Sequence, residues 1–437
     1  MIDSNTYKCA WAGEVPSDWE KVPLESIFTF GKGLSITKSD LKETGCPVIS
    51  YGQIHAKTCS GVEIDDELIR YVDESFINTS SNSLVSKNDI IVADTSEDIA
   101  GCGNAVRIST EDPIFSGYHT ITMKLKKDMN TKYIAYLMRT EAWREQIVKQ
   151  LTEVKLYTIS QTTLKNTYVL LPSKKVQYAI TDYLDSVTAQ IDEAIRRHNQ
   201  IIERIEEYKR AVIREVVTKG IDKNVELKSV ASPWIKEIPE HWGFVPLTSL
   251  FRTVDERNED PDALLLSLYT AIGVKPRNEL EERGNKATTV IDYKKVKKND
   301  IIVNKLLAWM GAIAYSDYDG VTSPDYDVYR AIPGANVSKA YYNSYFRYTQ
   351  FNEDCYLNGH GLMKMRWRTY PHELLRIKVP NPPKEEQERI SAYLVEFISK
   401  TDEAVSRQQL AIEKLEEYRK SVIYDAVTGK IDCRKEK

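Results

Sequence analysis

The fold is decided by a segment that occurs twice in the chain. Its first copy, residues 177–222, reads QYAITDYLDSVTAQIDEAIRRHNQIIERIEEYKRAVIREVVTKGID, and its second, residues 387–432, reads QERISAYLVEFISKTDEAVSRQQLAIEKLEEYRKSVIYDAVTGKID. The copies align without a gap at an offset of 387 − 177 = 210 residues, and both contain an Asp-Glu-Ala triplet and a Glu-Glu-Tyr triplet. An ungapped repeat of this length indicates a tandem duplication with a unit of about 210 residues.

Each copy is predicted to form one long helix. No Pro or Gly occurs from Lys174 to Val217, and apolar residues recur at alternating steps of three and four, which is the heptad pattern of a coiled coil. Ser173 and Pro382-Pro383 mark the helix starts, and Gly220 and Gly429 stand where C-terminal caps belong. The predicted seam residues are Leu184, Val187, Ile191, Ala194, His198, Ile201, Ile205, Tyr208 and Val212 in the first copy, and Leu394, Phe397, Thr401, Ala404, Gln408, Ala411, Leu415, Tyr418 and Val422 in the second.

Such a helix needs a partner of its own length. Its 44 residues would span about 65 Å, so the apolar seam cannot be buried by a small core. The other copy is the obvious partner, and we therefore expect an intramolecular two-helix coiled coil. One polar residue interrupts each seam, His198 in one copy and Gln408 in the other. We favour a register-setting polar layer for both, with a pH-sensitive or ligand role for His198 as the alternative.

A globular part precedes each helix. Short β-rich runs alternate there with Gly, Asn, Asp and Ser clusters, and shorter helical stretches follow. Lys87-Asn-Asp-Ile-Ile-Val92 recurs as Lys298-Asn-Asp-Ile-Ile-Val303, and the motif Pro-x-x-Trp that begins at Pro16 recurs at Pro239. The expected fold class is α+β, an internal repeat with domains at residues 1–172 and 221–380 and long helices at 173–220 and 381–437. Because the loops differ between copies, a shared scaffold with two different binding surfaces is expected.

Composition excludes several classes of protein. The 437 residues are 42% hydrophobic, carry a net charge of −4, and suit a folded chain of two or three domains. The longest apolar stretch, Ala263–Val274, is shorter than the roughly 20 residues of a membrane span. The first residues lack the pattern of a secretory signal, so a cytoplasmic protein is expected. The six cysteines form no C-x-x-C pair, which argues against a disulfide framework and against a metal site.

Motifs for catalysis are missing. Asn381-Pro382-Pro383-Lys384 resembles the base-binding motif of an adenine methyltransferase but has Lys where an aromatic residue must stack on the base. Gly31-Lys32-Gly33 lacks the third glycine of a cofactor loop, and no phosphate-binding G-x-x-x-x-G-K-[ST] loop occurs. Pro261-Asp262 with Asp292-Tyr293-Lys294 matches a loose nuclease pattern, as expected by chance among 64 acidic residues. We therefore predict a non-enzymatic chain without a cofactor of its own.

The layout resembles the specificity (S) subunit of type I restriction-modification enzymes. The second copy opens with Pro383-Lys-Glu-Glu-Gln-Glu-Arg-Ile390 and closes with Ala426-Val-Thr-Gly-Lys-Ile431, which fit the P-x-x-E-Q-x-x-I and A-V-T-G-x-I motifs of that family. The first copy departs from them, since Val176 replaces the Glu before Gln177 and Lys219-Gly220 reverses the order of Gly429-Lys430. The two Pro-x-x-Trp motifs also fit, so the resemblance covers essentially the whole chain.

This resemblance implies a DNA-reading subunit. Two target recognition domains, separated by two long conserved helices that pair as an antiparallel coiled coil, would read the halves of a bipartite double-stranded DNA site with a fixed spacer. The helices would also dock two adenine-methyltransferase (M) subunits, which bind S-adenosylmethionine, and restriction/translocase (R) subunits, which use ATP and Mg²⁺, could join them. A duplicated chain with pseudo-two-fold symmetry suits two half-sites about one DNA turn apart.

Residues that could contact DNA are polar, basic or aromatic and stand in expected loops. In the first domain they are Lys32, Tyr51, Gln53, His55, Lys57, Thr95, Ser96, Tyr118, His119, Lys155, Tyr157, Ser160 and Gln161. In the second domain they are Lys305, Trp309, Tyr326, His360, Lys364, Arg366, Trp367 and Arg368. For each of them the alternative is a surface residue or a residue packed within its own domain. Two other functions remain open for the chain, a coiled-coil scaffold or adaptor and the DNA-reading part of a single-chain nuclease-methyltransferase.

Overall fold

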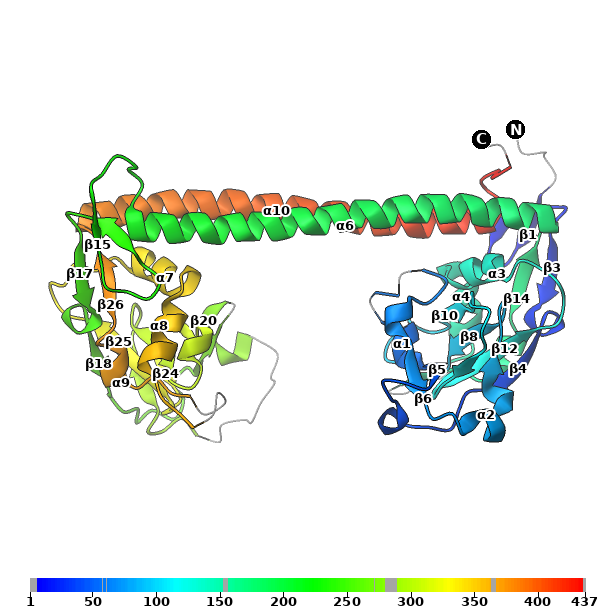
Figure 1. Cartoon of the computed structure of the whole chain (residues 1–437), viewed down its shortest axis with the longest axis horizontal. Helices are drawn as coiled ribbons and strands as arrows, with labels where there is room; N and C mark the ends of the chain where they lie inside the picture. The colour runs from blue at the N-terminus through cyan, green and yellow to red at the C-terminus, as the bar shows by residue number, and fades with distance from the viewer. Residues whose placement is uncertain are drawn as a thin grey trace. The chain divides into compact units, whose positions relative to one another are not determined.

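The chain forms two compact units. The computed structural model describes residues 6–434 except 57, 60, 152–155, 271, 280–288 and 363–366. Unit 1 comprises Met1–His198 with Leu410–Lys437, and unit 2 comprises Asn199–Gln409. Each unit therefore contains one globular part and a stretch of both long helices (Figure 1).

Unit 1 is built around two four-stranded sheets. One is antiparallel, with the order β10-β8-β12-β4, and the other has the order β6-β5-β11-β7 with β5 and β11 parallel. Short apolar β-branched runs such as Ile90-Ile-Val-Ala93 form the central, fully buried strands. The strands are β1 Thr6–Cys9, β2 Gly13–Pro16, β3 Glu20–Pro23, β4 Phe28–Lys32, β5 Cys46–Ile49, β6 Arg70–Val72, β7 Leu84–Val85, β8 Ile90–Ala93, β9 Thr95–Ser96, β10 Ala105–Arg107, β11 Ile114–Ser116, β12 Thr120–Leu125, β13 Tyr157–Thr158 and β14 Tyr168–Leu171.

Shorter α-helices accompany these strands. Two of them, α3 and α4, have apolar sides that are buried around Tyr133 and Trp143 in a core shared with the long helices. The helices are α1 Tyr51–Ile54, α2 Phe76–Thr79, α3 Thr131–Met138, α4 Glu141–Val148 and α5 Gln161–Lys165.

Unit 2 contains a four-stranded antiparallel sheet with the order β18-β25-β22-β23. Its central strand β22 is the run Ile301-Ile-Val-Asn304, the second copy of the motif that forms β8 in unit 1. The strands are β15 Leu227–Ser229, β16 Glu237–Pro239, β17 Gly243–Pro246, β18 Phe251–Val254, β19 Leu266–Tyr269, β20 Gly273–Pro276, β21 Lys294–Val296, β22 Ile301–Asn304, β23 Ile313–Tyr315, β24 Gly320–Thr322, β25 Tyr326–Ala331 and β26 Lys378–Asn381. The shorter α-helices are α7 Lys339–Tyr348, α8 Phe351–Asn358 and α9 Pro371–Leu374.

Two long helices follow the globular parts, as the sequence predicts. α6 spans Lys174–Lys219, 46 residues, and α10 spans Lys384–Val427, 44 residues. The carbonyls of Ser173 and Pro383 accept the first intrahelical bonds, from the residues three and four positions further on. Gly220 and Gly429 have φ values of +79° and +78°, the left-handed conformation in which glycine ends helices. No helix in the described part of the chain is long and apolar enough to cross a membrane.

The buried face of each long helix departs from a strict heptad. Leu184, Ile191, Leu394 and Val422 are buried, but Tyr208 and Tyr418 are 60% and 53% exposed. Tyr208 still packs edge to face on Phe397 of α10 at 5.7 Å within unit 2, and the residues after the two tyrosines also face inward. Lys209 donates to Asp402 at 2.9 Å within unit 2, and Arg419 forms an ion pair with Asp192 within unit 1. An α-helix with 3.6 residues per turn rotates by about 20° per heptad relative to an exact 3.5-residue repeat. Near the helix ends the buried position therefore shifts from the predicted seam residue to the residue after it.

The remaining predicted seam positions are exposed to different degrees. Thr401 is 9% exposed and buried, whereas Ile201 is 41% exposed. Most of the others are half-buried: Val187, Ala194, His198, Ile205, Val212, Phe397, Ala404, Gln408, Ala411 and Leu415.

Candidate nucleic-acid interface

The same end of the same strand pair carries polar and aromatic residues in both units. In unit 1, β8 ends at Ala93, which pairs with Thr120 at the start of β12. In unit 2, β22 ends at Asn304, which pairs with Tyr326 at the start of β25. The residues at and next to these strand ends include several of the predicted DNA contacts, and they differ between the units: Thr95, Ser96, Tyr118 and His119 in unit 1, and Lys305 and Tyr326 in unit 2.

In unit 1 this strand end carries an aromatic cluster. The ring of Tyr51 lies 5.5 Å from that of Tyr118, 5.3 Å from that of His119 and 6.1 Å from that of His55, all edge to face. His119 projects from the cluster, with its side chain 57% exposed and its Nδ1 atom 3.5 Å from Asp94 Oδ1. Its φ of +55° is a left-handed conformation that His adopts more readily than most residues. Burial and the neighbouring Tyr51 raise the pKa of Tyr118, so its hydroxyl remains a donor at neutral pH.

His55 is held from both sides of its ring. Its Nε2 atom lies 2.9 Å from the carbonyl oxygen of Thr95, and its Nδ1 atom lies 3.0 Å from the side-chain nitrogen of Asn104. Asn104 Oδ1 in turn accepts from Arg144 at 2.6 Å. A carbonyl oxygen can only accept, so the network assigns the proton to Nε2 and leaves Nδ1 as an acceptor. His55 therefore positions Thr95 and has no ring nitrogen left for a base.

Other first-domain candidates lie in structural hydrogen bonds. Ser96 is buried and its hydroxyl donates to Asp98 O at 2.7 Å, while the strand β9 that contains it pairs with Tyr157 of β13. Gln53 Oε1 accepts from Ser50 N at 3.0 Å, and Ser160 Oγ accepts from Thr163 N at 3.0 Å as the N-cap of α5. Lys32 ends β4, beside Ile121 of β12, and is exposed. Gln161 begins α5 and is half-buried, and Lys57 and Lys155 lie outside the described residues.

In unit 2 the corresponding strand end borders a cavity of about 430 Å³. Burial raises the pKa of Tyr326, and the neighbouring Asn304 side chain opposes that rise. Lys305 Nζ lies 3.8 Å from Asp325 Oδ1 at the rim. The lining consists of Leu265, Leu266, Ser267, Arg277, Tyr293, Asn304, Leu306, Ser323, Asp325 and Tyr326.

Lys305 lies between the cavity and the other second-domain residues that are predicted to contact DNA. Its carbonyl oxygen accepts from Thr369 N at 3.0 Å, next to Arg368, whose backbone exchanges two hydrogen bonds with that of His360. The Nδ1 atom of His360 lies 2.6 Å from Glu373 Oε1. Lys364 and Arg366, predicted on the same segment, lie outside the described residues.

Trp309 and Trp367 both contact Tyr356 in this region. The ring of Trp367 stacks on that of Tyr356 at 4.7 Å, and the ring of Trp309 lies 6.2 Å from it. The indole N–H of Trp367 donates to the backbone carbonyl of Tyr356, and the indole N–H of Trp309 donates to that of Leu306. Any contact that these tryptophans make to DNA is therefore limited to their ring faces and edges.

The sequence prediction missed the residues that support these surfaces. Asn104 and Arg144 were not predicted because their partners lie 40 or more positions away in sequence. Arg277 and Tyr293 were not predicted because they line the cavity from segments separate from its strand end. Asn304 could have been found, because it is the polar end of an otherwise apolar strand and stands where the first copy has Ala93. Among the residues that the structure describes, no three His, Cys, Asp or Glu side chains gather in a way that could hold a metal ion.

Comparison with known proteins finds similarity to one family. The family model described as "Type I restriction modification DNA specificity domain" matches residues 16–207. A protein of Methanocaldococcus jannaschii, provisionally named the specificity subunit of the type I restriction enzyme MjaX, is 23% identical over 441 aligned residues, which cover 97% of this chain and 96% of that protein. The EcoKI specificity subunit of Escherichia coli is 20% identical over 206 residues, 46% of this chain and 43% of that protein.

Solved structures share the fold. A chain from a structure of the type I R-M system, described for its complex assembly and conformational transition, aligns with a TM-score of 0.69 at 14% identity over 95% of this chain and 99% of that chain. The HsdS subunit of Thermoanaerobacter tengcongensis aligns with a TM-score of 0.51 at 14% identity over 95% of this chain and 98% of that one. Residues 16–207 thus match a type I restriction modification DNA specificity domain, and nearly the whole chain is similar to a specificity subunit of a type I restriction enzyme.

Proposed function

We propose that this chain is the non-catalytic subunit that chooses the DNA site of a type I restriction-modification complex in the cytoplasm. Two target recognition domains, residues 1–172 and 221–380, each read one half of a bipartite double-stranded site. The observation that carries the proposal is the pair of equivalent strand ends, which bear unlike polar and aromatic side chains in the two units. One scaffold with two different surfaces suits two unlike half-sites.

The long helices, at residues 173–220 and 381–437, are proposed to pair as an antiparallel coiled coil that sets the unread spacer. The two ion pairs between α6 and α10 support this arrangement, because Asp192 pairs with Arg419 whereas the later residue Lys209 pairs with the earlier residue Asp402. The charged residues come from matching positions in the two copies of the repeat, since 402 − 192 and 419 − 209 both equal 210.

The helices are also proposed to bind two adenine-methyltransferase subunits. Large apolar side chains at Val395, Leu410, Tyr208 and Tyr418 are more than half exposed on α6 and α10, which favours a protein partner on these helices. S-adenosylmethionine would bind to those subunits, and ATP and Mg²⁺ to the restriction/translocase subunits that could join them.

The test compares one substitution on each proposed reading surface in the complete methyltransferase complex. His119→Asn removes the imidazole while keeping a residue that tolerates positive φ, and Tyr326→Phe removes one hydroxyl. Each substitution is expected to relax one base position in one half-site, at a cost of about 1–3 kcal/mol in discrimination, and to leave the other half-site unchanged. Sequencing of methylated adenines across a genome measures both half-sites at once.

Tyr329→Phe is the matched control for Tyr326→Phe. Tyr329 lies on the same strand, β25, and its buried hydroxyl has no hydrogen-bond partner, so its loss is expected to leave both half-sites unchanged. Loss of methylation at all sites alike, with no change in base preference, would show that His119 and Tyr326 do not read bases.

A further inference from the structure

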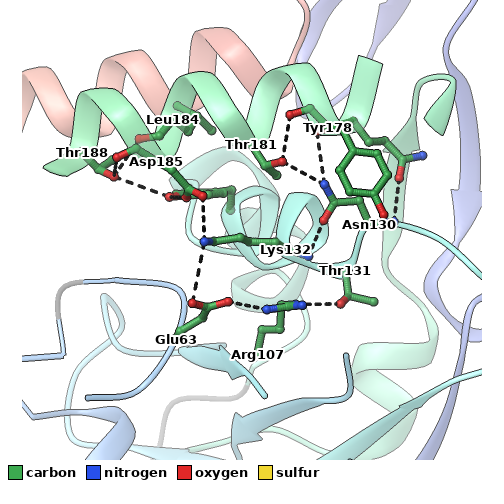
Figure 2. Close-up of polar contacts among 12 residues, drawn as sticks. Glu63, Arg107, Asn130, Thr131, Lys132, Tyr178, Thr181, Leu184, Asp185 and Thr188 are labelled. Carbon is green, nitrogen blue, oxygen red and sulfur yellow. Dashed lines mark hydrogen bonds and ion pairs between the residues drawn. The ribbon is translucent and has the colours of Figure 1, made fainter. Parts of the chain in front are cut away.

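A buried glutamine holds the recognition domain of unit 1 to the start of its long helix. Gln177 of α6 is 3% exposed, and its Oε1 atom accepts from the backbone N–H of Asn130 at 3.2 Å. Its Nε2 atom donates to Pro172 O at 2.8 Å. Asn130 is the N-cap of α3, and its side chain also donates to Thr181 Oγ1 of α6 at 2.9 Å (Figure 2).

The second copy makes the same contact with different residues around it. Gln387 of α10, at the position equivalent to Gln177, is fully buried. Its Oε1 atom accepts from the backbone N–H of Ser338 at 2.7 Å, and Ser338 is the N-cap of α7. Its Nε2 atom donates to Pro382 O at 2.9 Å and to Asn336 O at 3.1 Å. The repeated glutamine therefore binds the start of the domain helix in both units.

A tyrosine on the same domain helix reaches the end of the other long helix. In unit 1 the hydroxyl of Tyr133 lies 3.0 Å from Leu170 O and 3.2 Å from Val427 O, the last residue of α10. In unit 2 the hydroxyl of Tyr341 donates to Val217 O of α6 at 2.6 Å. The last carbonyls of a helix have no partner within the helix, so each hydroxyl fills a vacant acceptor. Burial raises the pKa of both tyrosines well above the usual value, which keeps them protonated donors.

Unit 1 has a further set of contacts between α6 and the domain. Asp185 of α6 accepts from Lys132 at 2.8 Å and from the Tyr136 hydroxyl at 2.7 Å, and Lys132 lies 3.7 Å from Glu63 (Figure 2). Glu63 also pairs with Arg107, which ends the sheet strand β10. The contacts thus continue from the long helix into the sheet whose strand end carries the proposed reading residues.

We propose that Gln177 with Tyr133, and Gln387 with Tyr341, are positioning residues that set the orientation of each recognition domain on the helices. Together each pair forms a clamp, because it ties α3 or α7 both to the helix that starts in that unit and to the helix that ends there. This inference rests on the proposed function, in which both domains must reach their half-sites across one fixed spacer. Because the clamp residues are not part of the proposed reading surface, that surface can change while the spacer between the half-sites stays constant.

Directional bonds suit this role better than apolar packing. Apolar contacts are non-directional and tolerate a small rotation of one element on another. A buried amide whose donor or acceptor has no hydrogen-bond partner costs free energy. The domain orientation that makes these bonds is therefore favoured over slightly rotated orientations. Loss of the clamp is therefore expected to widen the range of spacers that the two domains can accept together.

The test uses the full chain co-expressed with its methyltransferase subunits, and it measures methylated adenines across a genome. Tyr341→Phe removes one oxygen, and Gln387→Met keeps the side-chain volume but removes its polar bonds. Both variants are expected to methylate sites with unchanged half-sites but with a spacer one base pair longer or shorter, at least 10-fold more often than the wild type. Tyr345→Phe is the matched control, since this hydroxyl on the same helix is buried without a partner, and the spacer is expected to stay fixed.

Two results would overturn the clamp. One is methylation confined to the wild-type spacer in variants that still co-purify with the methyltransferase subunits. The other is loss of the folded complex, or a uniform loss of methylation at all sites, in both variants. Either form of this result would mean that the bonds only stabilise the fold. Absence of any split methylation motif in the wild-type complex would instead reject the proposed function itself, so the two failures are distinguishable.

Discussion

At the scale of single residues, hydrogen-bond partners distinguish the side chains proposed to read DNA from those that support the proposed reading surface. His55 uses both ring nitrogens on Thr95 and Asn104, whereas His119 on the same aromatic cluster projects outward. Both belong to the same residue type and stand in loops, so sequence reasoning predicts them alike. Their difference lies in contacts with residues about 40 or more positions away, which a single sequence does not reveal.

Asp354 gives a prediction about stability and pH. This carboxyl in α8 is 4% exposed, and burial raises its pKa to about 6, although the 2.7 Å hydrogen bond from Trp234 Nε1 acts in the opposite direction. The unfolded chain has a pKa near 3.8 at this residue. The folded state therefore holds the proton more tightly, so stability falls as the pH rises from about 4 through about 6.

Asp354→Asn is expected to remove this penalty while keeping an oxygen for Trp234. The variant should exceed the wild type in free energy of unfolding by about 1–3 kcal/mol at pH 8, and the gain should shrink towards pH 4. Urea unfolding at several pH values measures it. Glu240→Gln, which removes an exposed carboxylate of the same unit, is the control and should show no such pH-dependent gain. An equal effect of Asp354→Asn at pH 4 and pH 8 would contradict the assignment.

At the scale of elements, the repeat predicts the long helices better than it predicts their contacts. The absence of Pro and Gly, the heptad and the terminal glycines predict two long helices, which the structure has at Lys174–Lys219 and Lys384–Val427, although the predicted second segment, residues 381–437, is longer than the helix at both ends. The heptad also predicts Tyr208 and Tyr418 in the seam, but these tyrosines are exposed, and Lys209 and Arg419 face the partner helix. A pattern of apolar residues identifies the average buried face. An aromatic residue at the edge of that face can remain largely exposed and still contact the partner helix, as Tyr208 does with Phe397.

The end of α10 provides a prediction about the glycine cap. A Cβ atom at Gly429 would lie 2.6 Å from Pro16 Cγ and 3.1 Å from Trp19 Cζ2, so the repeated Pro-x-x-Trp motif packs directly on the cap. Gly429→Ala is expected to destabilise unit 1 by about 2–4 kcal/mol, from backbone strain plus overpacking. Thermal unfolding of the full chain measures the change.

Gly13→Ala, in the same unit, measures the cost of backbone strain without overpacking. Gly13 has a φ of +77°, but a Cβ atom there would meet nothing closer than Tyr424 Oη at 3.8 Å. Its cost is expected to be about 1 kcal/mol. Equal costs for the two substitutions would mean that the contact with Pro16 and Trp19 adds nothing.

At the scale of the whole molecule, the duplication carries most of what the sequence predicts. The offset of 210 residues indicates two globular parts with long helices, and the repeated Lys-Asn-Asp-Ile-Ile-Val run marks a central strand of one four-stranded sheet in each unit. The cavity beside Asn304 and Tyr326 could not be predicted, because its lining comes from five separate segments of unit 2. Duplication thus predicts the scaffold, while the surfaces that differ between the copies depend on contacts distant in sequence.

The central claim is that this chain selects a split DNA site for adenine methylation. Its most direct test is long-read detection of modified adenine across the genome of the source strain, with and without the gene. We predict a motif of two short, unlike sequences around a fixed unread gap, and loss of modification at that motif on deletion. If no modified adenine depended on the gene while the methyltransferase partner was expressed, the claim would be contradicted and a protein scaffold would become the better account.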